Sequence, residues 1–214
     1  MTSLLTIYPI EVTTHNLYFH EEASIFSIDS YIDILATSGG DNAIRLWKIK
    51  HIDKNKKDCK FKYTTSLNSS IKIEFLSEII CHTKSVNCIR FNESGYLASS
   101  SDGGKIVLSK EGKNTVIREH DGFDIYDLTW NKNILYVGVG NGLLEIYDID
   151  STVKLVYKKM IHSDFIQGIT FNFKYNLLAT LSKDRTAKLH FIDINRDKTN
   201  LNNNDSNDIL LTRN

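Results

Sequence analysis

The sequence predicts an all-β fold made of four repeated units. A histidine recurs at His20, His82, His120 and His162, and each is followed about twenty residues later by a polar turn and a short strand. The intervening runs are rich in β-branched and aromatic residues and are bounded by Gly, Asn, Asp or Ser, whereas helical spacing of apolar residues is rare. Self-similarity of this kind indicates supersecondary units that stack against one another.

Each unit is expected to contribute four strands. Apolar residues in the first strand of a unit fall at offsets 0 and +3, which breaks strict alternation and predicts a β-bulge near the start of that strand. The predicted inner strands are 85–91, 123–130 and 165–171, with a first copy around Ile25 and Ile28. The second strands are 35–38, 96–100, 135–139 and 177–181, the third strands are 43–49, 105–109, 143–149 and 187–192, and the outer strands are 71–80, 115–118, 153–157 and 209–212.

The domain boundaries follow from composition and from the histidine spacing. The first two histidines are 62 residues apart, against a repeat period of about 40 to 45 residues, so the first unit carries an insertion at 50–70. Residues 48–62 hold seven lysines and two aspartates, which fits either a solvated loop, the favoured interpretation, or a basic patch for DNA or an acidic partner. Residues 1–16 are interpreted as an N-terminal extension, 17–194 as the repeat domain, and 195–214 as an Asn-rich disordered tail.

The residues at the repeated positions resemble the WD40 family, whose unit is one four-stranded blade of a β-propeller. The resemblance implies that a turn carboxylate, the histidine, a hydroxyl and a tryptophan form a buried hydrogen-bond chain within a blade. The residues at these positions are His20, Thr37, Asp41 and Trp47 in the first copy, His82 and Ser99 in the second, His120 in the third, and His162, Thr180 and Asp184 in the fourth. The later copies are degraded, because Gly103 replaces the turn Asp of the second, Ser109 its Trp, Val137 the hydroxyl residue of the third and His190 the Trp of the fourth, so these blades are expected to depend more on apolar packing.

Three patterns that could carry other chemistry have simpler explanations. The His, Thr and Asp set of the first copy could be mistaken for a catalytic set, but a satisfied buried network exposes no nucleophile. The run Gly138–Gly142 leads into a strand rather than a helix, so it offers no helix N-terminus to a phosphate. Cys81, His82 and Cys88 lack the second ligand pair of a zinc site. We therefore expect no enzymatic activity, no cofactor and no metal.

Bulk composition limits the kinds of partner. Lysine and arginine number 26, and aspartate and glutamate also number 26, so no net charge attracts the chain to nucleic acid or to a membrane. The three cysteines lack C-x-x-C spacing, which favours reduced thiols inside the cell. No run approaches the roughly 20 apolar residues that a membrane span needs.

Several stretches are similar to the WD40 subunit, the middle subunit, of the replication-coupled chromatin assembly factor. They run collinearly from residue 17 to about residue 192 and include a junction between blades. The stretches are 35–49, 74–91, 120–130 with Ile125, Tyr126 and Asp127, and 165–171 followed by 179–185.

This resemblance implies a nuclear, non-enzymatic subunit that docks on the large subunit of the factor and helps to deposit histones H3 and H4 during replication-coupled nucleosome assembly. Contact with nucleic acid is expected at most indirectly or through the lysine-rich insertion, and no membrane contact is expected. Alternatives are a WD40 scaffold of a histone-regulator chaperone or of a ubiquitin-ligase adaptor, and an enzyme that uses the His, Ser/Thr and Asp sets at one open site. The residues beside the bulges are the candidate partner-binding rim: Ser24, Phe26, Ser85, Asn87, Asp124, Tyr126, Phe165 and Gln167.

The chain departs from the family in blade number. The family propeller has seven blades, whereas four are recognisable here, so an incomplete or open ring is expected. The N-terminal strand that closes the family ring is matched by residues 17–19, and the C-terminal segment through which the family binds a second histone chaperone has no counterpart. Open blade edges are prone to aggregation unless another polypeptide or a second copy covers them.

Overall fold

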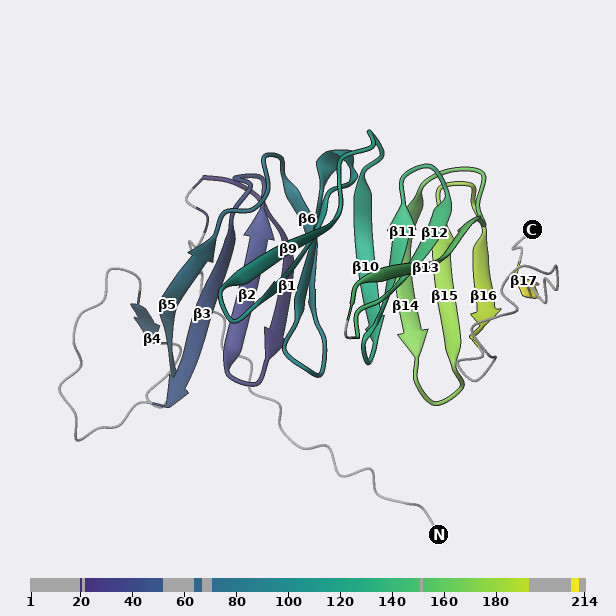
Figure 1. Cartoon of the computed structure of the whole chain (residues 1–214). Coiled ribbons are helices and arrows are strands. Elements are labelled where there is room, and N and C mark those ends of the chain that lie inside the picture. The colour runs from purple at the N-terminus through teal and green to yellow at the C-terminus, as the bar shows by residue number, and fades with distance from the viewer. Residues whose placement is uncertain are drawn as a thin grey trace, which may run out of the picture.

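Four antiparallel sheets stand side by side in a row, each forming one blade (Figure 1). The structure is a computed structural model, and it describes residues 20, 22–51, 64–66, 71–150, 152–192 and 209–211. The fold is therefore the predicted all-β arrangement of four blades. The residues predicted to form an N-terminal extension and a closing strand at 17–19 lie outside the described residues.

The strands follow one another across each blade from the inner to the outer edge, apart from β4, which pairs outside β5. The first blade contains β1 (Ile25–Tyr31), β2 (Ile34–Gly39), β3 (Ile44–His51), β5 (Ile71–Ile79) and the short β4 (Thr64–Ser66). The second contains β6 (Val86–Phe91), β7 (Leu97–Ser101), β8 (Ile106–Lys110) and β9 (Lys113–Arg118). The third contains β10 (Ile125–Asn131), β11 (Ile134–Val139), β12 (Leu143–Asp148) and β13 (Lys154–Met160), and the fourth contains β14 (Ile166–Asn172), β15 (Leu177–Ser182), β16 (Ala187–Phe191) and β17 (Ile209–Leu211).

The predicted bulge is present at the same place in every inner strand. The register with the second strand shifts between Ile25 and Ser27, and likewise between Val86 and Cys88. In the third and fourth blades it shifts between Ile125 and Asp127 and between Ile166 and Gly168. Because the four inner strands run in the same direction, all four bulges lie at the same edge of the row of blades.

Three apolar clusters hold neighbouring blades together. One face of β2 and β3, with Ala36 and Ile44, packs against Val86, Ile89 and Leu97 of the second blade. The next interface is the largest and joins the second blade to the third through residues including Ala98, Leu108, Leu128, Trp130 and Tyr147. The last joins Tyr136 and Leu144 to Ile166, Phe171 and Leu178. Each blade thus presents a second-strand and third-strand face to the inner strand of the blade that follows.

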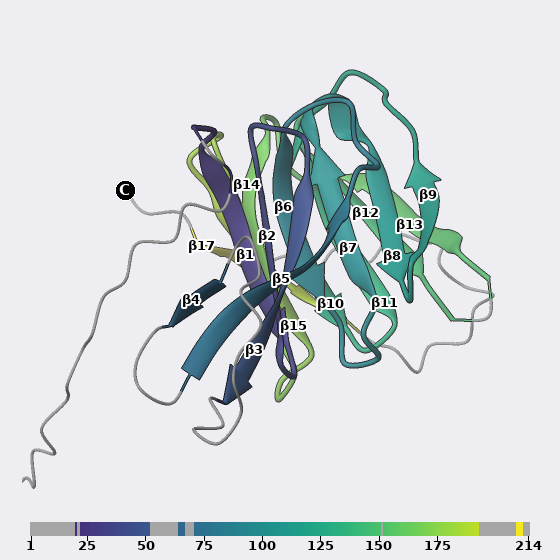
Figure 2. The ribbon, with the colours of Figure 1, turned by 90° about the vertical axis from the view of Figure 1, so that its left-hand side faces the viewer.

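The two end blades each have a face that no other described blade covers. In Figure 2 the first blade stands in front of the others. Its Ile28 is 59% exposed, although the counterparts of this residue in the second and third blades, Ile89 and Leu128, are buried. At the other end of the row, Leu181 and Phe191 of the fourth blade are 52% and 61% exposed. They lie on the face that corresponds to Ala36 and Ile44 of the first blade. The described blades therefore form an open row, as the count of four blades predicted.

The insertion and the tail contain short strands. Lys50 and His51 extend β3, and β4 pairs with the outer side of β5, so part of the insertion adds a fifth strand to the first blade. The strand β17 pairs with β16 where an outer strand was predicted at 209–212, within the segment also predicted to be a disordered tail. The remainder of both segments lies outside the described residues. The part of the chain that the structure describes contains no helix long and apolar enough to cross a bilayer.

Candidate functional site

The first blade contains a continuous buried hydrogen-bond chain. His20 Nδ1 lies 2.8 Å from Asp41 Oδ1, His20 Nε2 lies 2.9 Å from Thr37 Oγ1, and the Trp47 indole N–H donates to Thr37 Oγ1 at 3.0 Å. Arg45 forms an ion pair with the second carboxylate oxygen of Asp41. Burial alone would raise the pKa of Asp41, but the hydrogen bonds from Arg45 and His20 lower it. The four residues expected to interact in this copy are brought together.

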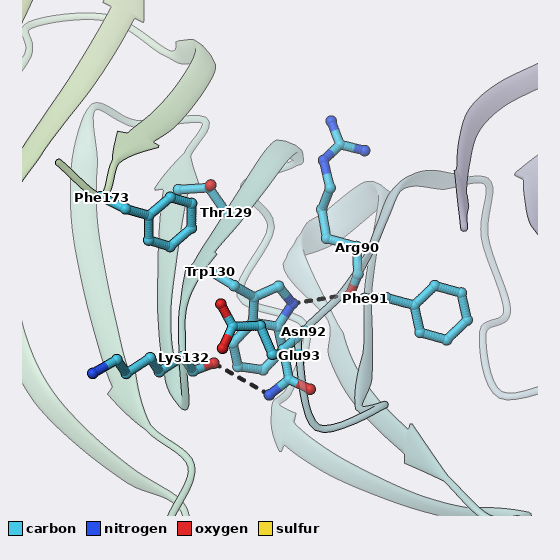
Figure 3. A pocket seen from close by; sticks show the side chains of 8 residues that line it. All are labelled: Arg90, Phe91, Asn92, Glu93, Thr129, Trp130, Lys132 and Phe173. Carbon is cyan, nitrogen blue, oxygen red and sulfur yellow. Dashed lines mark hydrogen bonds between the residues drawn. The ribbon is translucent and has the colours of Figure 1, made fainter. Parts of the chain in front are cut away.

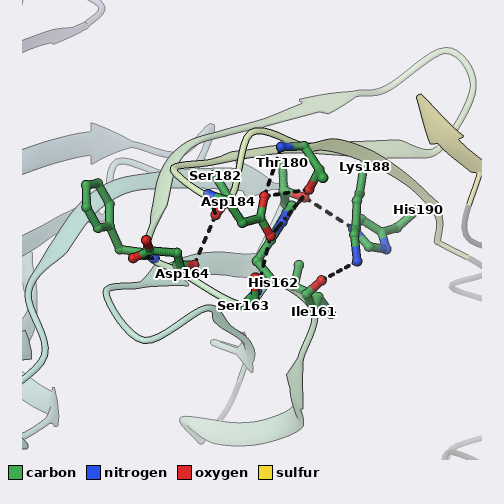
Figure 4. Close-up of polar contacts among 11 residues, drawn as sticks. Ile161, His162, Ser163, Asp164, Thr180, Ser182, Asp184, Lys188 and His190 are labelled. Atoms are coloured by element: carbon green, nitrogen blue, oxygen red, sulfur yellow. Dashed lines mark hydrogen bonds and ion pairs between the residues drawn. The ribbon is translucent and has the colours of Figure 1, made fainter. Parts of the chain in front are cut away.

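The fourth blade contains the same chain with a different last member (Figure 4). His162 contacts Asp184 Oδ2 and Thr180 Oγ1, both at 2.9 Å, and His190, which replaces the tryptophan, contacts Thr180 Oγ1 at 3.3 Å. Burial would raise the pKa of Asp184, but hydrogen bonds from Thr186 and His162 hold it far below its usual range. The loss of the tryptophan therefore lengthens one bond and leaves the rest of the chain in place.

The second blade contains only half of this hydrogen-bond chain. His82 Nε2 lies 2.8 Å from Ser99 Oγ, but His82 Nδ1 has no hydrogen-bond partner and is buried. Burial, followed by the nearby Lys105 and His120, lowers the pKa of His82 from 6.5 to about 4. The missing partner is the turn carboxylate, since Gly103 stands at the position of Asp41.

The expectation for His120 in the third blade was wrong. His120 is exposed and lies beside Gly103 of the second blade. The physical reason is that Val137 offers no hydroxyl for a histidine to bind, so the corner of the blade is filled by Arg118 instead. The Arg118 guanidinium donates to Glu145 Oε2 at 2.9 Å and to the carbonyl oxygen of Gly104 at 2.5 Å, and it pairs with Asp121.

A buried ion cluster therefore stabilises the third blade. Glu145 is 1% exposed and also accepts hydrogen bonds from Tyr147, at 2.8 Å, and from Lys158, at 2.8 Å. Burial would raise the pKa of Glu145, but Lys158, Tyr147 and the charge of Arg118 keep it below its usual range. Nothing in the spacing of the repeats predicted this cluster. A glutamate in a strand whose flanking residues are apolar was the one available signal.

None of these polar sets is open to a substrate. His20 is 2% exposed and Thr37 is 1% exposed, and their counterparts His162 and Thr180 are buried as well. Burial also raises the pKa of Cys88 to about 12, which keeps this thiol protonated. Among the described residues, no three His, Cys, Asp or Glu side chains converge as metal ligands. The interpretation of these sets as one open catalytic site is thereby removed.

The residues beside the bulges form the bulge rim, which we define as Ser24, Phe26, Ser85, Asn87, Asp124, Tyr126, Phe165 and Gln167. Four of them, Ser24, Phe26, Tyr126 and Gln167, are exposed, and the other four are half-buried. The half-buried members have structural contacts. Asn87 donates to Asp102 at 2.8 Å and to the carbonyl oxygen of Ile125 at 3.3 Å, and Asp124 accepts from the Gly103 N–H at 2.6 Å.

Aromatic rings are the largest exposed groups of the bulge rim. Phe26 is 52% exposed and Tyr126 is 42% exposed. The ring of Tyr126 lies 5.4 Å from that of Phe165, centroid to centroid, and Lys183 lies over Phe165. The Tyr126 hydroxyl also donates to Asp124 at 3.1 Å. This part of the rim presents a fixed apolar surface with polar edges, which is typical of protein interaction sites.

A second set of polar contacts, which the sequence did not reveal, ties the inner strands of neighbouring blades together. Asp29 accepts from the backbone N–H of Phe91 at 2.6 Å, and Asp127 accepts from that of Ile169 at 3.1 Å. Arg90 of β6 donates to Asp127 of β10 at 2.8 Å. These side chains fix the spacing between blades and therefore the relative positions of the bulge-rim residues.

A shallow cavity of about 190 Å³ lies at the opposite rim, between the hairpins of the second, third and fourth blades (Figure 3). Two of its polar side chains donate to backbone carbonyl groups of other lining residues. The Trp130 indole donates to the carbonyl oxygen of Arg90 at 2.9 Å, and the Asn92 amide donates to that of Lys132 at 3.2 Å. The cavity is a packing seam between blades.

Comparisons with known proteins agree with this architecture. The pattern of the family "WD domain, G-beta repeat" matches residues 73–108. A chromatin assembly factor 1 subunit of Schizosaccharomyces pombe is 30% identical over 176 residues, covering 70% of this chain, and the same subunit of Saccharomyces cerevisiae is 27% identical, covering 85%. Protein HIR1 of Kluyveromyces lactis is 29% identical over 79% of this chain. The computationally designed Ika4 protein, with a TM-score of 0.63 and 19% identity, covers 83% of this chain and 96% of its own, and shares the fold.

The matches cover only part of the relatives. The chain spans 31% and 46% of the two chromatin assembly factor 1 subunits and 22% of Protein HIR1. The similarity therefore concerns the blades and not the full length of these proteins.

Proposed function

Because the chain carries WD40 repeats and is homologous to one chromatin assembly factor 1 subunit over most of its length, we propose that it is a non-enzymatic subunit of a nuclear histone chaperone complex. In this role it docks on the large subunit of the chromatin assembly factor and helps to deposit histones H3 and H4 on replicated DNA. The observation that carries the proposal is the similarity to that one subunit in several species, over as much as 85% of this chain.

The bulge rim is the proposed docking surface for the large subunit. Its support is geometric, because Phe26 and Tyr126 are large exposed aromatic side chains on strands whose spacing is fixed by the contacts between blades. Buried aromatic anchors commonly dominate the binding energy of protein interfaces. Contact with nucleic acid is at most indirect or through the lysine-rich insertion.

The test is to tag the chain in its own cells and to identify the co-purifying proteins by mass spectrometry. A variant with Phe26→Ala, Tyr126→Ala and Phe165→Ala is purified alongside. Its matched control carries Ile32→Ala, Phe173→Ala and Tyr175→Ala, three exposed side chains at the opposite rim. Recovery of the large subunit with histones H3 and H4 by the wild type and the control, but not by the bulge-rim variant, supports both parts of the proposal. Recovery of neither partner by the wild type rejects it.

A second candidate is a subunit of an HIR-type chaperone, which the similarity to Protein HIR1 favours. The same purification separates the two candidates, since the proteins recovered with the chain differ. Partners of an HIR-type complex in place of the large subunit of the chromatin assembly factor would establish the second candidate.

A further inference from the structure

The second blade lacks a carboxylate that two other blades possess. In each blade, five residues separate the last paired residues of the second and third strands. The third of these five is Asp41 in the first blade, Asp184 in the fourth and Gly103 in the second. In the first and fourth blades that carboxylate lies 2.8 and 2.9 Å from the histidine Nδ1. The corresponding place beside His82 holds no carboxylate of its own turn.

His82 nevertheless lies in the same arrangement as the two histidines that bind this carboxylate in the other blades. It is 4% exposed, and its Nε2 bonds the hydroxyl of Ser99 as His20 bonds Thr37. Its Nδ1, on the side of the ring that faces the turn in the other blades, has no partner. A buried imidazole nitrogen without a hydrogen bond is unfavourable, and a single acceptor placed there would satisfy it.

Basic side chains surround the place where the carboxylate is missing. A Cβ atom on Gly103 would lie 3.0 Å from Lys84 Nζ and 2.9 Å from His120 Nδ1. Lys105 occupies the fifth position of the turn, where Thr186 of the fourth blade contacts both the histidine and the carboxylate. Burial is the main cause of the low pKa of His82, and the nearby Lys105 and His120 lower it further. We define this set, His82, Lys84, Gly103, Lys105 and His120, as the second-blade gap.

The acidic residues nearby do not fill the gap. Asp102 accepts a hydrogen bond from Asn87, Asp121 pairs with Arg118, and Asp124 accepts from the backbone N–H of Gly103 and from the hydroxyl of Tyr126. The side chains of Lys84 and His120 that lie over Gly103 are exposed. They can swing aside, so a group arriving from solvent can reach the gap.

We propose that the second-blade gap binds an aspartate or glutamate side chain from an acidic segment of a partner protein, whose carboxylate takes the place that Asp41 and Asp184 hold in the first and fourth blades. The charge of Lys84 and Lys105 complements such a segment. Asp124 joins the gap to the bulge rim, because it contacts both Gly103 and Tyr126, so a partner seated on Tyr126 has the gap within reach. The proposal stands on the geometry of the blades and holds whichever complex the chain serves.

Binding leaves a spectroscopic signature at His82. Without the carboxylate, Ser99 Oγ donates to the carbonyl oxygen of Val107, so the Nε2–H of His82 donates to Ser99. With the carboxylate, the Nδ1–H of His82 donates to it and Nε2 becomes an acceptor, as the chain in the first blade requires of His20. The two tautomers of a neutral imidazole have different nitrogen chemical shifts.

The test uses an acidic octapeptide of alternating Asp and Glu, its neutral counterpart of alternating Asn and Gln, and sodium acetate. Fluorescence anisotropy gives the affinity of the labelled peptides at constant ionic strength, and nitrogen NMR of the histidine rings reports the tautomer of His82. We expect saturable binding of the acidic peptide alone, with His82 changing to the Nδ1–H form while His20 and His162 stay unchanged. We expect at least a tenfold loss of affinity in the Lys84→Gln, Lys105→Gln double variant.

Gly103→Asp supplies the carboxylate within the chain and should abolish binding of the acidic peptide. If this variant does not fold, since residue 103 has a φ of +77°, the lysine variant decides the question. The proposal is overturned if the acidic peptide does not bind, if its affinity is unchanged in the lysine variant, or if acetate produces the same change at His82 at the same concentration. The result is independent of the co-purification experiment, which concerns the aromatic residues of the bulge rim.

Discussion

Four strands follow one another in the same order in the first and third blades, but different residues fill the same buried polar corner of these two blades. In the first blade, Asp41, His20, Thr37 and Trp47 form a chain of hydrogen bonds around a neutral hydroxyl. In the third, Arg118 and Glu145 form a buried ion pair at the equivalent corner, and Glu145 stands opposite Val137 just as Arg45 stands opposite Thr37. The polar groups at this corner can therefore be satisfied without the residues that define the repeat.

The two solutions differ in what happens when one member is lost. Loss of the neutral hydroxyl in the first blade removes hydrogen bonds and leaves one or two polar atoms unpaired, whereas loss of one partner of the ion pair in the third blade leaves a buried charge. The second blade lies between these cases, because it keeps the histidine and the hydroxyl but lacks the carboxylate. Substitutions in each blade can separate these cases.

The largest effect is expected from Glu145→Ala in the third blade. Because the buried guanidinium of Arg118 would keep only the exposed Asp121 as an ionic partner, we expect a loss of about 3–5 kcal/mol in the free energy of unfolding, measured by urea denaturation. The double variant Arg118→Met, Glu145→Leu should be more stable than Glu145→Ala, since it removes both charges. Equal stability of the two variants would show that the ion pair is not what stabilises this corner.

The second effect is a pH dependence of the free energy of unfolding that comes from His82 in the second blade. Its pKa of about 4 lies below the ordinary value of 6.5, so the unfolded chain binds more protons between these pH values. As far as His82 is concerned, the folded protein is most stable above pH 6.5. Its free energy of unfolding falls as the pH falls towards 4, by about 3 kcal/mol in total. Urea midpoints at a series of pH values measure it. His82→Leu should flatten the slope in this range, and an unchanged slope would assign the dependence to other groups.

The third effect is expected from Thr37→Val in the first blade, which removes the hydroxyl but keeps the shape of the side chain. His20 Nε2 and the Trp47 indole would each lose a bonding partner, and we expect a cost of about 1–3 kcal/mol in the free energy of unfolding. Thr37→Ser keeps the hydroxyl and should cost less. A cost for Thr37→Val that exceeds that of Glu145→Ala would reverse the comparison between the two blades.

The smallest effect on stability is expected at the bulge rim. Phe26→Ala in the first blade and Tyr126→Ala in the third should each change the free energy of unfolding by about 1 kcal/mol or less, because both side chains are about half exposed. Thermal unfolding with calorimetric detection measures this. Losses of several kcal/mol would mean that these rings belong to the blade core rather than to a binding surface.

The pattern of residues along the chain was enough to predict the all-β class, the four blades and the bulges. These features can be read along a single strand. The offsets between Ile125 and Leu128, and between Ile166 and Ile169, show which side chains of a strand are buried against the neighbouring blade. The resemblance to the WD40 family also implied the members of the first hydrogen-bond chain, which are His20, Thr37, Asp41 and Trp47.

Where the repeat is degraded, the polar groups that meet are set by how the blades pack in three dimensions. Arg118 and Glu145 are 27 residues apart in sequence and meet because the outer strand of one blade turns into the corner of the next. His120 was expected to lie in that corner and lies instead beside Gly103 of the preceding blade. A side-chain pattern records which face of a strand is buried, but the partner of a buried charge is fixed by the packing of strands that are distant in sequence. The sequence showed that Gly103 replaces the turn carboxylate, but the ion cluster, the unpaired nitrogen of His82 and the basic side chains beside Gly103 could be found only in the folded chain.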